Sequence, residues 1–139
     1  MKTKILFLIC FLCYLNTFSQ EEEKTNYINK HFDPSYFPNG ISNINLYVNT
    51  SCGRCENIVN ILNNDSIKFN KLEISDPKID EELKIKIYKA TPYKNLATAT
   101  HYPVFEIDTV VFYCIENHVT FTNDLIKYLK SFNKIKKAE

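Results

Sequence analysis

The residues of this chain best suited to covalent chemistry are two cysteines separated by two residues, in the segment Cys52-Gly53-Arg54-Cys55. A pair at this spacing forms a disulfide that exchanges with other thiols, forms a structural bridge, or supplies two ligands to a metal ion. Exchange requires a thiolate, which the free amides of a helix N-terminus and a neighbouring cation both stabilise. Arg54, the only arginine in the sequence, supplies such a cation inside the segment.

The sequence predicts a buried strand before the cysteine pair and a helix directly after it. Residues 44–48 alternate apolar and polar side chains, as a half-buried strand requires. Apolar side chains then recur at positions 55, 58, 59 and 62, which form one stripe on a helix. We therefore expect Cys52 to be the exposed, attacking sulfur at the mouth of the helix. Cys55, one turn further on, is expected to be the buried, resolving sulfur.

The remaining patterns predict one small α/β domain. In chain order, the further elements are a strand at about 67–74, a helix between Asp76-Pro77 and Thr91-Pro92, strands at 104–107 and 110–115 joined at Asp108-Thr109, and a helix after a turn at 116–118. The order strand, helix, strand, helix, strand, strand, helix predicts a four-stranded mixed sheet in a three-layer α/β/α sandwich.

The first nineteen residues have the pattern of a secretory signal peptide. A basic head precedes the uncharged apolar run 5–15, and small residues at 17 and 19 favour cleavage before Gln20. An uncleaved anchor and a lipoprotein modified at Cys10 or Cys13 are the alternatives. The protein is therefore expected to be exported to the periplasm or cell envelope, or secreted, and to meet a membrane only through this segment if it is uncleaved.

Composition and boundaries limit what the rest of the chain does. We expect a polar and aromatic lead-in at 20–43, a domain at 44–133 and a basic tail at 134–139. The formal net charge of +1 gives no electrostatic case for nucleic-acid binding. Only two glycines are present, so no glycine-rich phosphate loop is formed. No organic cofactor is implied, because two cysteines carry the electrons of disulfide exchange. The protein is expected to be a monomer.

Residues 46–55 (LYVNTSCGRC) together with Tyr102-Pro103-Val104-Phe105 resemble the thioredoxin-fold superfamily, and its glutaredoxin branch most closely. The similarity extends over residues 44–132. It implies a thiol–disulfide oxidoreductase acting on disulfide-containing or dithiol proteins, in which Cys52 attacks and Cys55 releases the mixed disulfide. It also implies that Pro103 has a cis peptide bond and faces the cysteines, and that Tyr102 presents its backbone to the substrate.

Several positions depart from the glutaredoxin pattern. Gly-Arg stands where Pro-Tyr is usual between the cysteines, and His101-Tyr102 replaces the Thr-Val of the glutathione site. Residues 117–120 replace a Gly-Gly pair. These departures argue against glutathione as the partner. Leu46 also occupies the position at which related chains carry a buried acid.

Two other functions stay open at this point: a binding module with a structural disulfide, and a metal carrier. Cys52, Cys55, Cys114 and His118 are a nominal four-ligand set, but the expected hairpin position of Cys114 argues against convergence. Cys114 is expected to be a small buried apolar residue. His101 is either a solvated loop residue or a group that tunes the thiolate or contacts substrate. The direction of electron flow is not determined.

Overall fold

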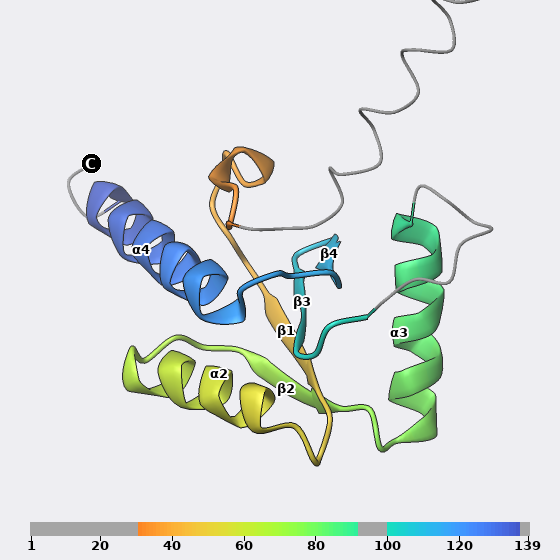
Figure 1. Cartoon of the computed structure of the whole chain (residues 1–139). Helices are drawn as coiled ribbons and strands as arrows, with labels where there is room; N and C mark the ends of the chain where they lie inside the picture. Colours follow the sequence, from red (N-terminus) through yellow and green to blue (C-terminus); the bar gives the residue numbers. More distant parts are fainter. Residues whose placement is uncertain (1–30, 92–99, 137–139) are drawn as a thin grey trace, which may run out of the picture.

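The computed structural model describes residues 31–91 and 100–136 (Figure 1). Its elements, in chain order, are η3 (Pro34–Tyr36), β1 (Ile44–Val48), α2 (Gly53–Asn64), β2 (Asn70–Glu73), α3 (Pro77–Ala90), β3 (Val104–Ile107), β4 (Val110–Phe112) and α4 (His118–Lys136). The described chain is thus an α/β fold, and the predicted order of strands and α-helices is confirmed. The predicted signal peptide 1–19, its cleavage site and the start of the lead-in lie outside the described residues, as does most of the expected loop after α3.

The four strands form one mixed sheet in the order β2-β1-β3-β4. Strand β1 pairs in parallel with β2, with Val48 opposite Glu73. It pairs antiparallel with β3, with Tyr47 opposite Val104, and β3 forms a hairpin with β4. Because β1 ends where β3 begins, the chain that follows β1 and the chain that precedes β3 emerge at the same edge of the sheet. That edge carries both the cysteine pair and Pro103.

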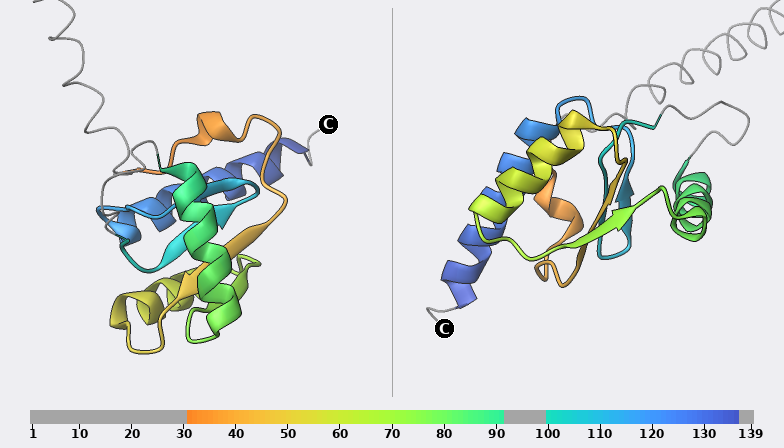
Figure 2. Two further views of the ribbon diagram at one scale, coloured as in Figure 1. Left: turned by 90° about the vertical axis from the view of Figure 1, so that its right-hand side faces the viewer. Right: turned by 90° about the horizontal axis from the view of Figure 1, so that it is seen from below.

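Helices cover both faces of the sheet. Helices α2 and α4 lie together on one face, and α3 lies on the other (Figure 2). The alternation of strand side chains divides the core accordingly. Leu46 and Phe105 belong to the core beneath α2 and α4, whereas Tyr47 and Val104 pack with Leu83 of α3. The three layers follow from this division of the apolar side chains between the two faces.

Part of the aromatic lead-in belongs to the core. Phe32 and Phe37 are both buried and stack with ring centroids 5.6 Å apart. Phe32 also packs edge-on against Phe121 of α4, and the hydroxyl of Tyr128 donates to the carbonyl of Phe37. Tyr36 stays mostly exposed. The described residues before β1 therefore close one side of the α2–α4 core.

Two predicted strands are shorter in the structure. The chain expected to begin a strand at 67 is still completing the turn after α2, because Ile67 N–H donates to the carbonyl of Leu62. Strand β4 ends at Phe112 rather than 115, and the carbonyl of Tyr113 accepts instead from the N–H of His101. The first difference arises from a hydrogen bond within a turn, and the second from a hydrogen bond between residues distant in sequence. The alternation of apolar and polar residues predicts neither.

Helix α4 is longer at both ends than the pattern indicates. It includes His118, for which the sequence predicts a turn, and it passes the expected domain boundary at 133 to reach Lys136. The side chain of Asn117 accepts from Thr120 N–H at 3.0 Å, which caps the start of the helix. Within residues 31–91 and 100–136, no helix has both the length and the apolar character needed to cross a bilayer.

Candidate functional site

A disulfide between Cys52 and Cys55 lies at the start of helix α2. Their Cα atoms are 5.2 Å apart, within the usual range for this bond. Cys52 is the N-cap residue and remains partly exposed, whereas Cys55 is only 2% exposed. The predicted positions of the outer and the inner sulfur are both confirmed.

Local structure at both ends of the motif fixes this position. The buried strand β1 ends at Val48, and a turn follows in which Cys52 N–H donates to the carbonyl of Asn49 at 3.3 Å. The carbonyl of Cys52 then accepts from Glu56 N–H at 3.2 Å, which begins the helix. The apolar stripe of α2 that begins at Cys55 packs into the core between this helix and the sheet. The Cys55 sulfur is therefore held in the core, while the Cys52 sulfur stays at the edge of the core.

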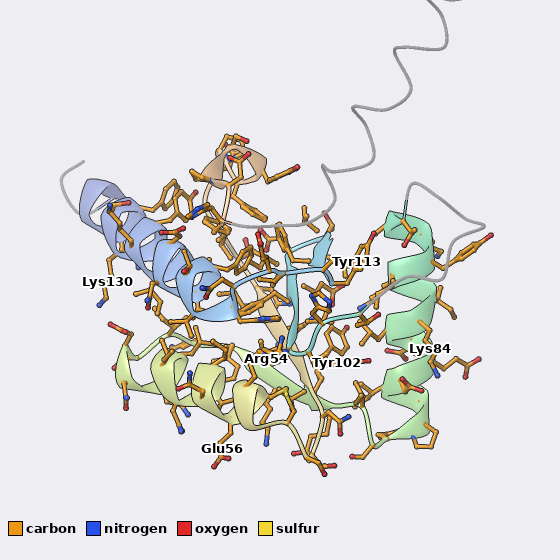
Figure 3. All side chains as sticks on the ribbon, viewed as in Figure 1. Arg54, Glu56, Lys84, Tyr102, Tyr113 and Lys130 are labelled. Carbon is orange, nitrogen blue, oxygen red and sulfur yellow. A yellow bond between two sulfur atoms is a disulfide. The ribbon has the colours of Figure 1, made fainter. Side chains whose placement is uncertain are left out.

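The outer sulfur also receives a hydrogen bond from the helix. The N–H of Cys55 donates to Cys52 Sγ at 3.1 Å. In the reduced protein, this amide and the helix dipole would stabilise negative charge on Cys52. Arg54 is exposed and lies on the side of α2 that faces the loop before β3, whereas Glu56 lies on the other side (Figure 3).

The residues implied to frame a substrate occupy the loop before β3. The Tyr102–Pro103 peptide is cis, as the resemblance implies, and Pro103 is buried. His101 is exposed, with its Nδ1 atom 3.3 Å from the carbonyl of Ile115. Tyr102 is half-buried and packs against both cores, and burial, with the charge of Asp80, raises the pKa of its phenol. Its hydroxyl therefore stays neutral at physiological pH.

His118 is a site residue whose position the sequence does not reveal. Its side chain is 2% exposed, and its Nε2 atom lies 2.9 Å from the carbonyl of Pro103 and 3.1 Å from that of His101. Burial lowers the pKa of the His118 imidazole, the two carbonyl contacts oppose this shift, and the charges of Arg54 and His101 add to it. The imidazole of His118 is therefore neutral, and it contacts the backbone of the loop before β3.

A hollow of about 510 Å³ opens beside the disulfide, on the β2 side. Its walls are the turn after β1, the first two turns of α2 and the outward ends of strand β2. The lining residues are Val48, Asn49, Thr50, Ser51, Cys52, Gly53, Cys55, Glu56, Val59, Lys71 and Glu73. None of His101, Tyr102 and Pro103 lines it, because β1 separates β2 from β3. The sequence analysis did not identify this hollow, since it depends on the pairing of β2.

The four nominal metal ligands are not assembled. In the described part of the chain, no three His, Cys, Asp or Glu side chains are grouped closely enough to hold a metal ion. Cys114 is unbridged and only 3% exposed, and burial raises the pKa of its thiol. It is thus the small buried residue that the sequence predicts, and the set with Cys52, Cys55 and His118 does not converge.

Among residues 31–91 and 100–136, the one strongly buried carboxylate is on a different strand from the position considered in the sequence. Leu46 is fully buried among apolar side chains, as expected for that position without an acid. Glu106 of β3, in contrast, accepts from Lys86 at 2.8 Å, Tyr47 at 2.8 Å and Asn45 at 2.9 Å. Although burial raises it, these hydrogen bonds lower the pKa of Glu106 overall. The group is a satisfied ion pair between α3 and the sheet.

Comparisons with known proteins add no relative to this description. No family model, no curated protein and no solved structure matches the chain. The feature of the described chain most suited to chemistry is the site itself, where a partly exposed sulfur at a helix N-cap is bonded to a buried one.

Proposed function

We propose that this protein is a thioredoxin-like thiol–disulfide oxidoreductase that uses Cys52 and Cys55 as its redox centre. One observation carries the proposal: the pair combines an accessible sulfur that accepts a helix amide with a partner buried one turn inside. A purely structural bridge has no need for this difference in exposure. The loop that carries Tyr102 and Pro103 lies at the same sheet edge, which supports the same function.

Both directions of the reaction use the same two steps. In reduction, the Cys52 thiolate attacks one sulfur of a substrate disulfide, so that a mixed disulfide forms and the other substrate sulfur leaves as a thiolate. The Cys55 thiolate then attacks Cys52 Sγ, which closes the Cys52–Cys55 disulfide and releases the second substrate thiolate. Two electrons pass from the pair to the substrate. Oxidation of a substrate dithiol is the reverse.

The neighbouring residues have distinct parts in this proposal. Arg54 adds positive charge near the attacking sulfur. Gly53 carries no side chain that could cover Cys52, and a Cβ at its position would meet no heavy atom within 4 Å outside its two chain neighbours and the backbone of its own helix. The backbone of Tyr102 and Pro103, with the exposed His101, forms the surface along which an extended substrate segment lies.

The substrates we propose are disulfides or dithiols of exported polypeptides rather than glutathione. The hollow on the β2 side gives room for a residue next to the substrate cysteine, and its charged walls, with Lys71 paired to Glu73 at 2.9 Å, suit a polar segment. The exported location rests on the amino-terminal pattern of residues 1–19 alone.

A redox titration tests the proposal directly. The purified protein is equilibrated with graded dithiothreitol, alkylated and analysed by mass spectrometry, with Cys52→Ser and Cys114→Ser as controls. We expect a reversible two-electron transition between about −120 and −270 mV that Cys52→Ser abolishes and Cys114→Ser leaves unchanged. A bridge that resists reduction well below this range, with no exchange activity, would instead establish a binding module with a structural disulfide.

A further inference from the structure

The buried imidazole of His118 joins helix α4 to the loop that precedes β3. Its Nε2 atom is 2.9 Å from the Pro103 carbonyl and 3.1 Å from the His101 carbonyl. These two carbonyls flank Tyr102. The imidazole thus contacts the backbone on both sides of the residue whose own backbone faces the substrate in the proposed function.

We propose that His118 is a positioning residue for disulfide exchange, which holds the His101–Pro103 backbone in the conformation that a polypeptide substrate requires beside Cys52. The proposal rests on the proposed function, since it assigns a role within that reaction. His118 touches neither sulfur in this assignment. It acts through the loop, and its effect falls on substrate binding rather than on the electron transfer between sulfurs.

The loop before β3 depends on a hydrogen-bond donor from another element. Pro103 has no N–H, so the segment has one backbone donor fewer than an ordinary strand entrance. His101 is anchored through its own N–H, which donates to Tyr113 at 2.9 Å. Beyond His101, the Nε2–H of His118 holds the segment by donating to carbonyls on either side of Tyr102. Without the Nε2–H donor of His118, the buried carbonyl oxygen of Pro103 loses a hydrogen bond.

The chemistry of the ring fixes its tautomer. Both neighbours of Nε2 are carbonyl oxygens, which only accept, so the proton must be on Nε2. The Nδ1 atom is buried and has no hydrogen-bond partner among the described residues. A charged ring would place a second N–H there without an acceptor, with Arg54 of α2 and His101 of the loop adding repulsion. The neutral Nε2–H form is the one that fits.

The start of α4 keeps this donor in place. Asn117 caps the helix through Thr120 N–H, and the hydroxyl of Thr122 donates to the carbonyl of His118 at 2.6 Å. Thr122 is fully buried and does not contact the loop through any of these bonds. It therefore offers a control: loss of its hydroxyl removes a buried hydrogen bond at the same residue without removing the donor to Pro103.

Three variants test the assignment: His118→Leu, which has no donor; His118→Gln, which keeps a distal N–H donor; and Thr122→Val. Each is assayed with dithiothreitol as electron donor on two substrates, insulin as a polypeptide disulfide and bis(2-hydroxyethyl) disulfide as a small one. For His118→Leu we expect KM for insulin to rise about tenfold, the effect of one lost hydrogen bond of about 1.4 kcal/mol. Turnover of the small disulfide and the midpoint potential of the Cys52–Cys55 pair stay unchanged.

The matched variants separate positioning from stability. We expect His118→Gln to restore most of the affinity for insulin, and Thr122→Val to lower the melting temperature without changing KM. Equal losses on both substrates, or a Thr122→Val effect like that of His118→Leu, would overturn the assignment. So would a wild-type KM in folded His118→Leu protein. If the wild type exchanges neither substrate, it is the proposed function that fails, and the assignment fails with it.

A measurement on the unmodified protein tests the hydrogen bond on which the assignment rests, even if His118→Leu does not fold. Long-range ¹H–¹⁵N NMR correlations of the imidazole report which nitrogen carries the proton. We expect the Nε2–H tautomer at neutral pH. A predominant Nδ1–H tautomer would mean that His118 does not donate to the loop, and would overturn the assignment.

Discussion

The N–H of Cys55 donates to Cys52 Sγ at 3.1 Å, so each member of the disulfide has a different relation to helix α2. Cys52 caps the helix from outside, and Cys55 is the third residue of the first turn and lies in the core. The asymmetry is a property of the backbone and does not require the bond between the sulfurs. We therefore expect it to persist in the reduced protein and to determine which sulfur meets a substrate.

Trapping experiments should show this order of attack. Cys55→Ser leaves the exposed Cys52 thiol without a resolving partner, so we expect it to accumulate mixed disulfides with oxidised polypeptides. Among the described residues, Cys52→Ser leaves only the buried thiols of Cys55 and Cys114, so trapped complexes should fall at least tenfold. Nonreducing electrophoresis followed by mass spectrometry measures the yield, with Cys114→Ser in both backgrounds as the control. Equal trapping by the two variants would contradict the assigned roles.

The two glycines of the chain differ in what a side chain would meet. Gly40 has a φ of +86°, and a Cβ there would overlap the ring of Phe132. Gly40→Ala should therefore lower the free energy of unfolding by about 2 kcal/mol. Gly53 has no such φ, and outside its chain neighbours and its own helix backbone no atom lies within 4 Å of a Cβ there, so Gly53→Ala should change stability by less than about 0.5 kcal/mol.

Urea denaturation of both alanine variants beside the wild type checks this difference. The two substitutions are chemically identical, so each serves as the control for the other. A loss at Gly53 equal to that at Gly40 would show that the start of α2 is more constrained than its surroundings indicate. The redox titration of Gly53→Ala then shows whether access to Cys52 has changed.

The sequence predicts the cysteine site well because its determinants are local. Alternation over residues 44–48 and the stripe that begins at Cys55 locate a strand and a helix on either side of Cys52. Asp76 caps α3 and Pro77 opens it, both as predicted, because a cap depends on bonds within two residues. Such features are readable one segment at a time.

Other parts of the site depend on packing between distant segments. His118 and Pro103 are fifteen residues apart and belong to different segments, and no periodicity in the sequence predicts their contact. Glu106 interrupts an apolar strand and would be expected to face solvent. It is buried because Lys86 reaches it from α3. The hollow beside Cys52 exists because β2 pairs outside β1 and exposes Lys71 and Glu73. Pairing and side-chain reach decide these three features.

The ion pair between Lys86 and Glu106 should respond unequally to loss of either partner. Lys86→Met leaves the Glu106 carboxylate, only 10% exposed, without its counter-charge, and should lower the free energy of unfolding by about 3 kcal/mol. Glu106→Gln leaves a Lys86 side chain that is already 36% exposed and can turn toward water. We expect that variant to lose about 1 to 2 kcal/mol.

A double-mutant cycle measured by urea denaturation gives the coupling between the two. The Lys86→Met, Glu106→Gln double variant should be more stable than the sum of the single losses predicts, because no unpaired charge remains buried. Lys84→Met, which removes the exposed pair with Asp80 on the same helix, is the control and should cost less than about 0.5 kcal/mol. Additive losses would contradict direct coupling.

Protonation of His118 should determine how the free energy of unfolding changes with pH in mildly acidic solution. Since the folded-state pKa of this imidazole lies below its ordinary value of 6.5, the unfolded chain takes up a proton that the folded protein does not. The contribution of His118 to stability should therefore be complete above about pH 7, and the free energy of unfolding should fall as the pH is lowered through 6.5. The lowered pKa of Glu106 contributes a separate loss that begins only near its ordinary value of 4.5.

Denaturation curves between pH 7.5 and 5.0 measure this slope, and His118→Gln is the variant to compare. Its free energy of unfolding should vary less over that interval, because the group that resists protonation is gone. Thr122→Val, which keeps the imidazole of His118, is the control and should lower the free energy of unfolding by a similar amount at every pH of that interval. If the slope survives unchanged in His118→Gln, a group other than His118 takes up the proton on unfolding. The buried donor to the Pro103 carbonyl would then not be the pH-sensitive contact of the loop.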